Sequence, residues 1–177
     1  SDADPKLGEA HFESAVHILE DLVKMHHANT DWRRDLSVMR SRLGDMELRR
    51  GLVEAARMTH EKALADAKVL MELNPANTIW RHDVALKYVS IGLVAKKMGD
   101  ADGALTAWAQ ARDLLEALAK KEPTNATVRR DARTVERLLA ASGFQPRGAK
   151  DELSPTRRPM APRGVKVTSP GGCFGPR

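Results

Sequence analysis

The feature that most constrains this chain is a segment that recurs every 48 residues. The motif "NTDWRRD" at 29–35 returns as "NTIWRHD" at 77–83 and again as "NATVRRD" at 125–131, where valine replaces tryptophan. A chain built from one recurring unit buries its apolar surface mainly between neighbouring copies of that unit. The repeat therefore predicts an elongated stack of similar units.

Other residues keep the same register. Gly44 aligns with Gly92, and Phe12 lies two offsets before Trp108. The alignment extends to the N-terminal segment, which we interpret as the second half of an earlier repeat. We therefore expect the chain to belong to a longer polypeptide, or to pack this first segment against a partner.

Within each repeat, the apolar residues follow a helical period. In 101–121 they recur at steps of three and four residues, which is typical of an amphipathic helix. Pro75 and Pro123 cannot continue a helix, and the asparagine two residues after each can cap the next one. The pattern predicts six helices, at approximately 6–27, 30–49, 52–73, 78–98, 101–121 and 126–142.

The net charge of +5 comes from the C-terminal segment. Residues 144–177 hold seven basic and two acidic side chains, whereas 1–143 hold 22 of each kind. The segment also contains six of the nine prolines and no apolar period. Such a segment cannot bury enough surface to offset the entropy of ordering, so we predict a disordered basic tail after a repeat domain at 1–143.

Cysteine content and hydropathy limit the cellular setting. The single Cys173 cannot form an intramolecular disulfide, which is compatible with a reducing compartment, and we expect a cytoplasmic location. No stretch approaches the roughly 18 apolar residues that a membrane-spanning helix needs.

The second repeat resembles the tetratricopeptide repeat family. The family pattern W-x2-L-G-x2-Y, A-x3-F and P is met by "YVSIGLVA" at 88–95, by Ala104 and Trp108, and by Pro123. The first repeat matches less well, with His60 where an aromatic residue is expected. The period is also 48 residues rather than the usual ~34, so the chain looks like a long-helix variant of the family.

This resemblance implies an all-α fold, in which antiparallel helix pairs stack as a right-handed α-solenoid. It also implies a non-catalytic scaffold for protein–protein interaction that binds a protein or peptide on its concave face. By position in the family pattern, we expect this face to carry Arg42, Arg49, Val89, Leu93, Lys96, Lys97 and Arg137. A surface of this kind suits acidic or amphipathic partner segments.

No motif indicates an enzyme, a cofactor or a metal site. The six histidines form neither HExxH nor a pair at i, i+4 spacing, and no glycine-rich phosphate loop is present. The recurring arginines and aspartates of the "WRRD" motif are interpreted as inter-helix ion pairs. Trp32 and Trp80 are interpreted as rings that fasten a helix start onto the preceding helix.

Two alternatives stay open. Arg157 and Arg158 in the basic tail could contact the phosphates of a nucleic acid or another polyanion, although the neutral 1–143 segment argues against this reading. Self-assembly into a homo-oligomer through exposed repeat ends is the other alternative.

Overall fold

A computed structural model describes residues 5–143 of the 177-residue chain. The predictions made for 144–177, including those for Arg157 and Arg158, lie outside the described residues. Within 5–143 every element is an α-helix, so the prediction of an all-helical fold is confirmed for this part of the chain. None of these helices is both long and apolar enough to span a membrane.

The six helices repeat the 48-residue register of the sequence. They are α1 (Pro5–Met25), α2 (Thr30–Arg49), α3 (Val53–Leu73), α4 (Thr78–Met98), α5 (Ala101–Lys121) and α6 (Ala126–Ala141). The first residues of the odd-numbered helices are 48 positions apart, and so are those of the even-numbered helices. The predicted ranges differ from these bounds by a residue or two at several ends.

The even-numbered helices begin where they do because an asparagine caps each of them. The side-chain oxygens of Asn29, Asn77 and Asn125 each accept hydrogen bonds from the backbone N–H groups two and three residues ahead. These bonds satisfy donors that have no partner within the helix. Helix α4 ends at Gly99, whose φ of 83° is a left-handed conformation that glycine adopts without strain.

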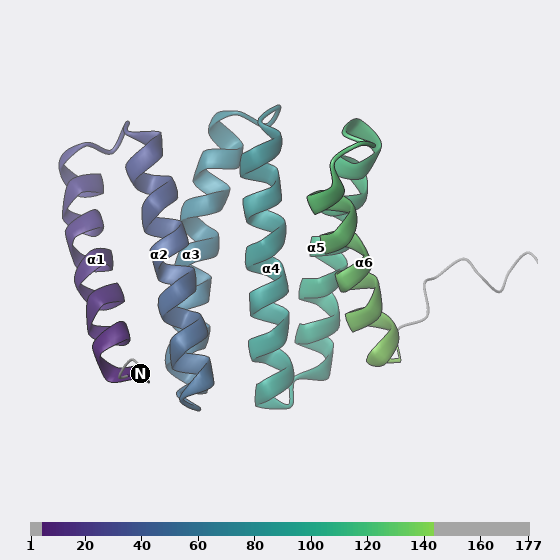
Figure 1. Ribbon diagram of the computed structural model, residues 1–177, viewed down its shortest axis with the longest axis horizontal. Coiled ribbons are helices and arrows are strands. Elements are labelled where there is room, and N and C mark those ends of the chain that lie inside the picture. The colour runs from purple at the N-terminus through teal and green to yellow at the C-terminus, as the bar shows by residue number, and fades with distance from the viewer. Residues whose placement is uncertain (1–4, 144–177) are drawn as a thin grey trace, which may run out of the picture. The chain divides into compact units, whose positions relative to one another are not determined.

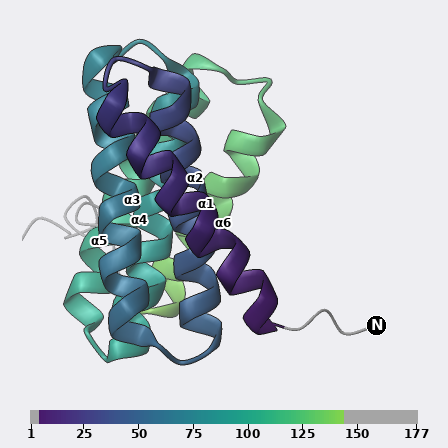
Figure 2. The ribbon, with the colours of Figure 1, turned by 90° about the vertical axis from the view of Figure 1, so that its left-hand side faces the viewer.

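Helices that follow each other in the chain also pack against each other. This holds from α1 through α6, and α2 additionally contacts α4. In Figure 1, α3 lies behind α2 and α5 lies behind α6. Figure 2 views the same unit from the α1 end, where α1 is the outermost helix.

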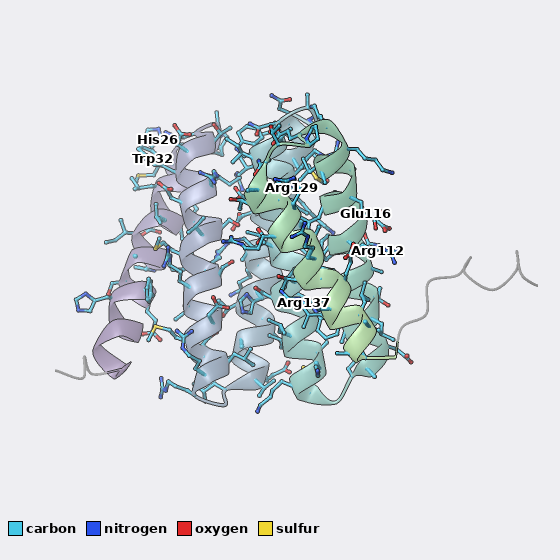
Figure 3. All side chains as sticks on the ribbon, turned by 45° about the vertical axis from the view of Figure 1, so that its right-hand side comes forward. His26, Trp32, Arg112, Glu116, Arg129 and Arg137 are labelled. Atoms are coloured by element: carbon cyan, nitrogen blue, oxygen red, sulfur yellow. The ribbon has the colours of Figure 1, made fainter. Side chains whose placement is uncertain are left out.

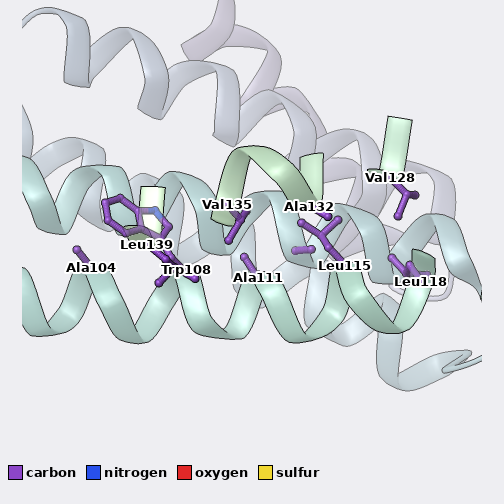
Figure 4. Close-up of a cluster of buried hydrophobic side chains, with 10 residues drawn as sticks. Ala104, Trp108, Ala111, Leu115, Leu118, Val128, Ala132, Val135 and Leu139 are labelled. Carbon is purple, nitrogen blue, oxygen red and sulfur yellow. The ribbon is translucent and has the colours of Figure 1, made fainter. Parts of the chain in front are cut away.

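The main core lies between α4, α5 and α6. Trp108 is completely buried there, beside Ala104, Ala111 and Leu115 of its own helix. Figure 4 shows this face of α5 against the apolar face of α6, which contributes Val128, Ala132, Val135 and Leu139. These four residues recur at steps of three and four along α6, so they form one apolar stripe.

On α2 and on α4, a glycine makes room for a large residue on the next helix. A Cβ atom placed on Gly92 would lie 2.3 Å from Nε1 of Trp108, and one placed on Gly44 would lie 2.8 Å from the ring of His60. His60 thus occupies in the first repeat the position that Trp108 occupies in the second. The residue that weakens the family match in the sequence is therefore a buried core residue.

Candidate functional site

Two inter-helix contacts at equivalent positions connect the even-numbered helices. Nε of Arg34 on α2 donates to Asp83 on α4 at 2.7 Å, and Nε2 of His82 on α4 lies 2.9 Å from Asp131 on α6. Arg34 and His82 are 48 residues apart, as are Asp83 and Asp131. The same kind of inter-helix contact therefore occurs twice, once between α2 and α4 and once between α4 and α6. We refer to these three helices as the row of even-numbered helices.

These pairs refine the interpretation of the "WRRD" motif. Asp83 and Asp131 do contact the preceding even-numbered helix, but through the residue that follows Arg33 or Arg81 rather than through those arginines. Asp83 forms an ion pair with Arg34, and Asp131 contacts the imidazole of His82. Arg33 instead contacts Asp66 on α3 at 3.3 Å. Arg81 donates to the carbonyl oxygen of Pro75 at 3.4 Å.

A second ionic network joins α1, α2 and α3. Asp66 is buried on α3, where it accepts hydrogen bonds from Arg33 and Arg40 of α2. Arg40 also donates to Glu20 on α1. One guanidinium thus bridges two carboxylates on different helices, which fixes the positions of three neighbouring helices relative to one another.

The residues predicted to bind a partner lie on the row of even-numbered helices. Six of the seven are exposed: Arg42, Arg49, Leu93, Lys96, Lys97 and Arg137. Leu93 is 40% exposed, so this leucine of α4 offers an apolar side chain to solvent beside the two lysines. Figure 3 shows Arg137 on α6, the last helix of this row.

Val89 is the exception among the seven. Its side chain is only partly exposed and packs against the core around Trp108. Its carbonyl oxygen accepts a hydrogen bond from Nε1 of Trp108 at 3.3 Å. Val89 therefore packs into the core beneath the predicted binding surface. Lys96 is exposed on that surface, with its Nζ 5.9 Å from the centre of the Trp108 ring.

Sequence reasoning missed a buried polar group beneath this row. Lys87 of α4 is 7% exposed, and burial lowers its pKa, against the opposing effect of Asp83 and Asp45. Burial also lowers the pKa of His60, whose Nε2 lies 3.4 Å from Asp45. One signal was available: at the equivalent positions of the other repeats Lys87 is replaced by methionine and valine.

The tryptophans at the helix starts are only partly buried. Trp32 contacts His26 edge-to-face, with 5.1 Å between ring centres, which places it against the turn before α2 (Figure 3). Trp80 is similarly half-buried, so its ring is a weaker anchor than the fully buried Trp108.

Two hollows in the described unit are lined by none of the predicted binding residues. One, of about 470 Å³, runs along α5 and α6 and is lined by Glu116, Ala119, Lys120, Arg129, Ala132, Arg133 and Glu136. The other, of about 210 Å³, adjoins the starts of α4 and α6 and includes the His82 side chain. In the described residues no three His, Cys, Asp or Glu side chains converge as metal ligands would.

Comparison with known proteins gives no assignment: no family model matches the sequence, and no curated protein matches it.

Proposed function

We propose that the chain is a non-catalytic protein–protein interaction scaffold whose even-numbered helices form the partner-binding surface. In this proposal the helix pairs stack as a right-handed α-solenoid of the tetratricopeptide kind, in a long-helix variant. The concave face of that solenoid carries the contact residues. No cofactor takes part.

The repeated contact between even-numbered helices carries this proposal. Arg34–Asp83 and His82–Asp131 hold α2, α4 and α6 side by side through their partly buried side chains. A row held at fixed spacing can present side chains from three helices to one extended segment without reordering on binding. That is what a peptide-binding scaffold requires.

The chemistry of the exposed row favours an acidic or amphipathic partner. Arg42 and Arg49 lie on α2, Lys96 and Lys97 on α4, and all four are exposed. Leu93 lies within one helical turn of the two lysines and offers an apolar contact. Basic groups around an exposed leucine fit a segment that combines carboxylates with an apolar anchor.

A peptide-display selection tests the proposal directly. Peptides selected on the intact protein should be enriched in acidic and apolar residues. The Lys96→Glu, Lys97→Glu variant should bind those peptides about tenfold more weakly or worse, because two attractive charges become repulsive.

A matched variant separates this surface from general charge effects. Lys62→Glu, Lys120→Glu makes the same change in net charge at exposed positions on α3 and α5. Its affinity for the selected peptides should stay close to that of the unmodified protein. Equal losses in both variants, or no loss in either, would contradict the proposed surface.

The charge of the tail supports one other candidate function, binding of nucleic acid or another polyanion. All five surplus positive charges of the chain lie in 144–177. Gel-shift assays with and without these residues, at two salt concentrations, separate the two functions. A shift that requires the tail and falls steeply with salt would favour the polyanion.

A further inference from the structure

Lys87 is a buried charge with which no described residue pairs. Its side chain is 7% exposed, yet it forms no hydrogen bond and no ion pair within the part of the chain that the structure describes. The equivalent positions of α2 and α6 hold Met39 and Val135, which fill the same place in the repeat without a charge. Because a buried cation without a partner lowers the stability of a fold, packing alone does not account for a lysine here.

The two carboxylates that act on Lys87 are engaged by other groups. Asp83 accepts hydrogen bonds from Arg34 at 2.7 and 3.3 Å. Asp45 lies 3.4 Å from Nε2 of His60, and its side chain is 51% exposed to solvent. Burial lowers the pKa of Lys87 by more than these two carboxylates raise it. The ammonium group is therefore left without a counter-ion of its own.

The nitrogen of Lys87 still reaches solvent. The polar atoms that are fully enclosed without a partner include both ring nitrogens of His60 but not Nζ of Lys87. The apolar stem of the lysine is thus buried while its ammonium group lies at the surface, as is common for long basic side chains. An anion from solution can therefore contact this group.

Two polar side chains beside Lys87 also have unused donors. Arg42 on α2 is exposed, and its positive charge acts on Lys87. Ser90 lies one turn after Lys87 on α4, at the position that Arg42 occupies on α2. Neither the Arg42 guanidinium nor the Ser90 hydroxyl has a hydrogen bond among the described residues. Three unused donors therefore lie at one level of the row, where α2 contacts α4 (Figure 1).

The contact between α4 and α6 has no equivalent group. There the positions of Arg42, Lys87 and Ser90 are taken by Ser90, Val135 and Leu138. The three donors are thus specific to one place in the row and are not a product of the repeat. Both α2 and α4 have packed neighbours before and after them, so the donors are not left open by an end of the sequence.

Exposed leucines on both sides of the donors indicate the kind of anion. Leu86 and Leu93 are 36% and 40% exposed, and they flank Ser90 along α4. An ion that is charged throughout, such as phosphate, would leave both leucines in water, whereas an acidic residue with apolar neighbours covers them. Because the donors lie near the middle of α4, a bound segment can continue past them in both directions. A side-chain carboxylate therefore fits better than a C-terminal one.

We propose that Lys87, Arg42 and Ser90 form a binding site for the carboxylate of an aspartate or glutamate side chain that has apolar neighbours in the bound segment. This inference rests on the proposed function and adds the group that sets its specificity. A partly desolvated cation binds a carboxylate more strongly than an exposed one does. Lys96 and Lys97 attract an acidic segment, whereas Lys87 selects where in that segment the acidic residue stands.

Lys87→Met tests whether the charge serves binding rather than packing, because it introduces the residue that stands at Met39 in α2. The variant should have a higher melting temperature, since a buried charge is removed. It should nevertheless bind the selected acidic peptides about tenfold more weakly or worse. Lys62→Met removes the same charge from an exposed position of α3 and should leave the affinity unchanged. Unchanged affinity of Lys87→Met would overturn the proposal, and so would a loss of stability, because the lysine would then serve the packing.

A double-mutant cycle identifies the carboxylate that Lys87 binds. In a peptide with an amidated C-terminus, the acidic residue is replaced by the corresponding amide. This change should weaken binding to the unmodified protein about as much as Lys87→Met does, and it should have little further effect on the variant. Coupling that appears only in peptides with a free C-terminal carboxylate would overturn the assignment to a side chain.

A small probe tests the site without any selected peptide. N-acetyl-aspartate N-methylamide carries one side-chain carboxylate and no terminal charge. In the intact protein with ¹³C at the lysine ε carbons, it should shift the Lys87 signal saturably, and N-acetyl-asparagine N-methylamide should not. The Lys87 signal is identified by its absence from Lys87→Met. No saturable shift, or a larger shift with inorganic phosphate, would overturn the proposal.

Failure of this site and failure of the proposed function give different results. If Lys96→Glu, Lys97→Glu loses peptide binding but Lys87→Met retains it, the proposed function stands and the carboxylate site does not. A saturable response of Lys87 to the aspartate probe, with no peptide selected on the protein, would support the site and contradict the proposed function.

The acidic residues of the chain's own C-terminal segment are the other possible occupants. Residues 144–177 contain Asp151 and Glu152. Asp151→Asn, Glu152→Gln should leave the Lys87 signal of the free protein unchanged. A shifted signal would identify this segment as the occupant and overturn the assignment to a bound partner segment.

Discussion

At the scale of single residues, the first repeat differs from the second at the buried position that faces the helix glycine. His60 fills the place of Trp108 against a glycine, and neither of its ring nitrogens has a hydrogen-bond partner among the described residues. Asp45 and Lys87 are the charged groups facing it, and they act on its pKa in opposite directions. An imidazole buried in this way should be neutral in the folded protein.

The lowered pKa of His60 predicts a loss of stability in acid. Below its ordinary value of 6.5 the unfolded chain takes up a proton that the folded chain resists. The free energy of unfolding should therefore fall as the pH drops below 6.5, until the folded-state pKa is passed. Urea unfolding at pH 7.5 and pH 5 should show a larger loss for the unmodified protein than for His60→Phe.

His17 is the matched control for this measurement, because its side chain is 76% exposed on α1. His17→Asn should leave the difference between the two pH values unchanged. The idea fails if His60→Phe retains the full acid sensitivity, since the sensitivity would then arise from other groups.

At the scale of helices, close approach is set by small residues. Ala104 of α5 is 2% exposed and belongs to the same core as Ala85 and Trp108. Ala104→Leu should lower the free energy of unfolding by roughly 1–3 kcal/mol, because the added atoms overpack a filled core. Ala117→Leu, at an exposed position on the same helix, should change it by less than about 0.5 kcal/mol. Equal effects in thermal or urea unfolding would contradict this packing.

The helices themselves could be predicted well from the sequence, for local reasons. An asparagine cap at a fixed place in each repeat defines where the even-numbered helices begin, and a proline two residues before the cap adds a second signal for α4 and α6. The apolar period then identifies the buried face of α5 and α6. These signals depend on neighbouring residues only, so they can be read without knowing how the helices pack.

Contacts between helices could not be predicted to the residue. The aspartates of the repeat motif pair with Arg34 and His82, one position away from the arginines that the motif repeats most strictly. A change of one residue rotates a side chain by about 100° around its helix, and only the packed arrangement decides which residue faces the partner. For the same reason, six predicted surface residues are exposed but Val89 partly faces the core.

At the scale of the whole helical unit, stability should vary along the stack. Helices α2, α3, α4 and α5 each pack against the helix before and the helix after them, whereas α1 and α6 are the end helices of the described unit and pack mainly against α2 and α5, respectively. In an array of this kind each helix is stabilised mainly by its immediate neighbours. The two end helices should therefore open more readily than the middle ones.

The two end helices, α1 and α6, should also differ in how readily they open. Helix length and apolar burial predict opposite orders of opening for them. Helix α1 has 21 residues and α6 has 16, so helix length alone would favour α1. Burial favours α6, which has four buried apolar residues, whereas Val23 is the single one in the part of α1 whose side chains are described. Because packing contributes more to helix stability than length does in short helices, α1 should open first.

Hydrogen–deuterium exchange followed by mass spectrometry, corrected for intrinsic rates, should show the fastest exchange in α1, slower exchange in α6 and the slowest in α3 to α5. Protection of α1 equal to that of α6 would contradict this order and show that Phe12, Ala15, Leu19 and Leu22 are better covered than their partial exposure indicates.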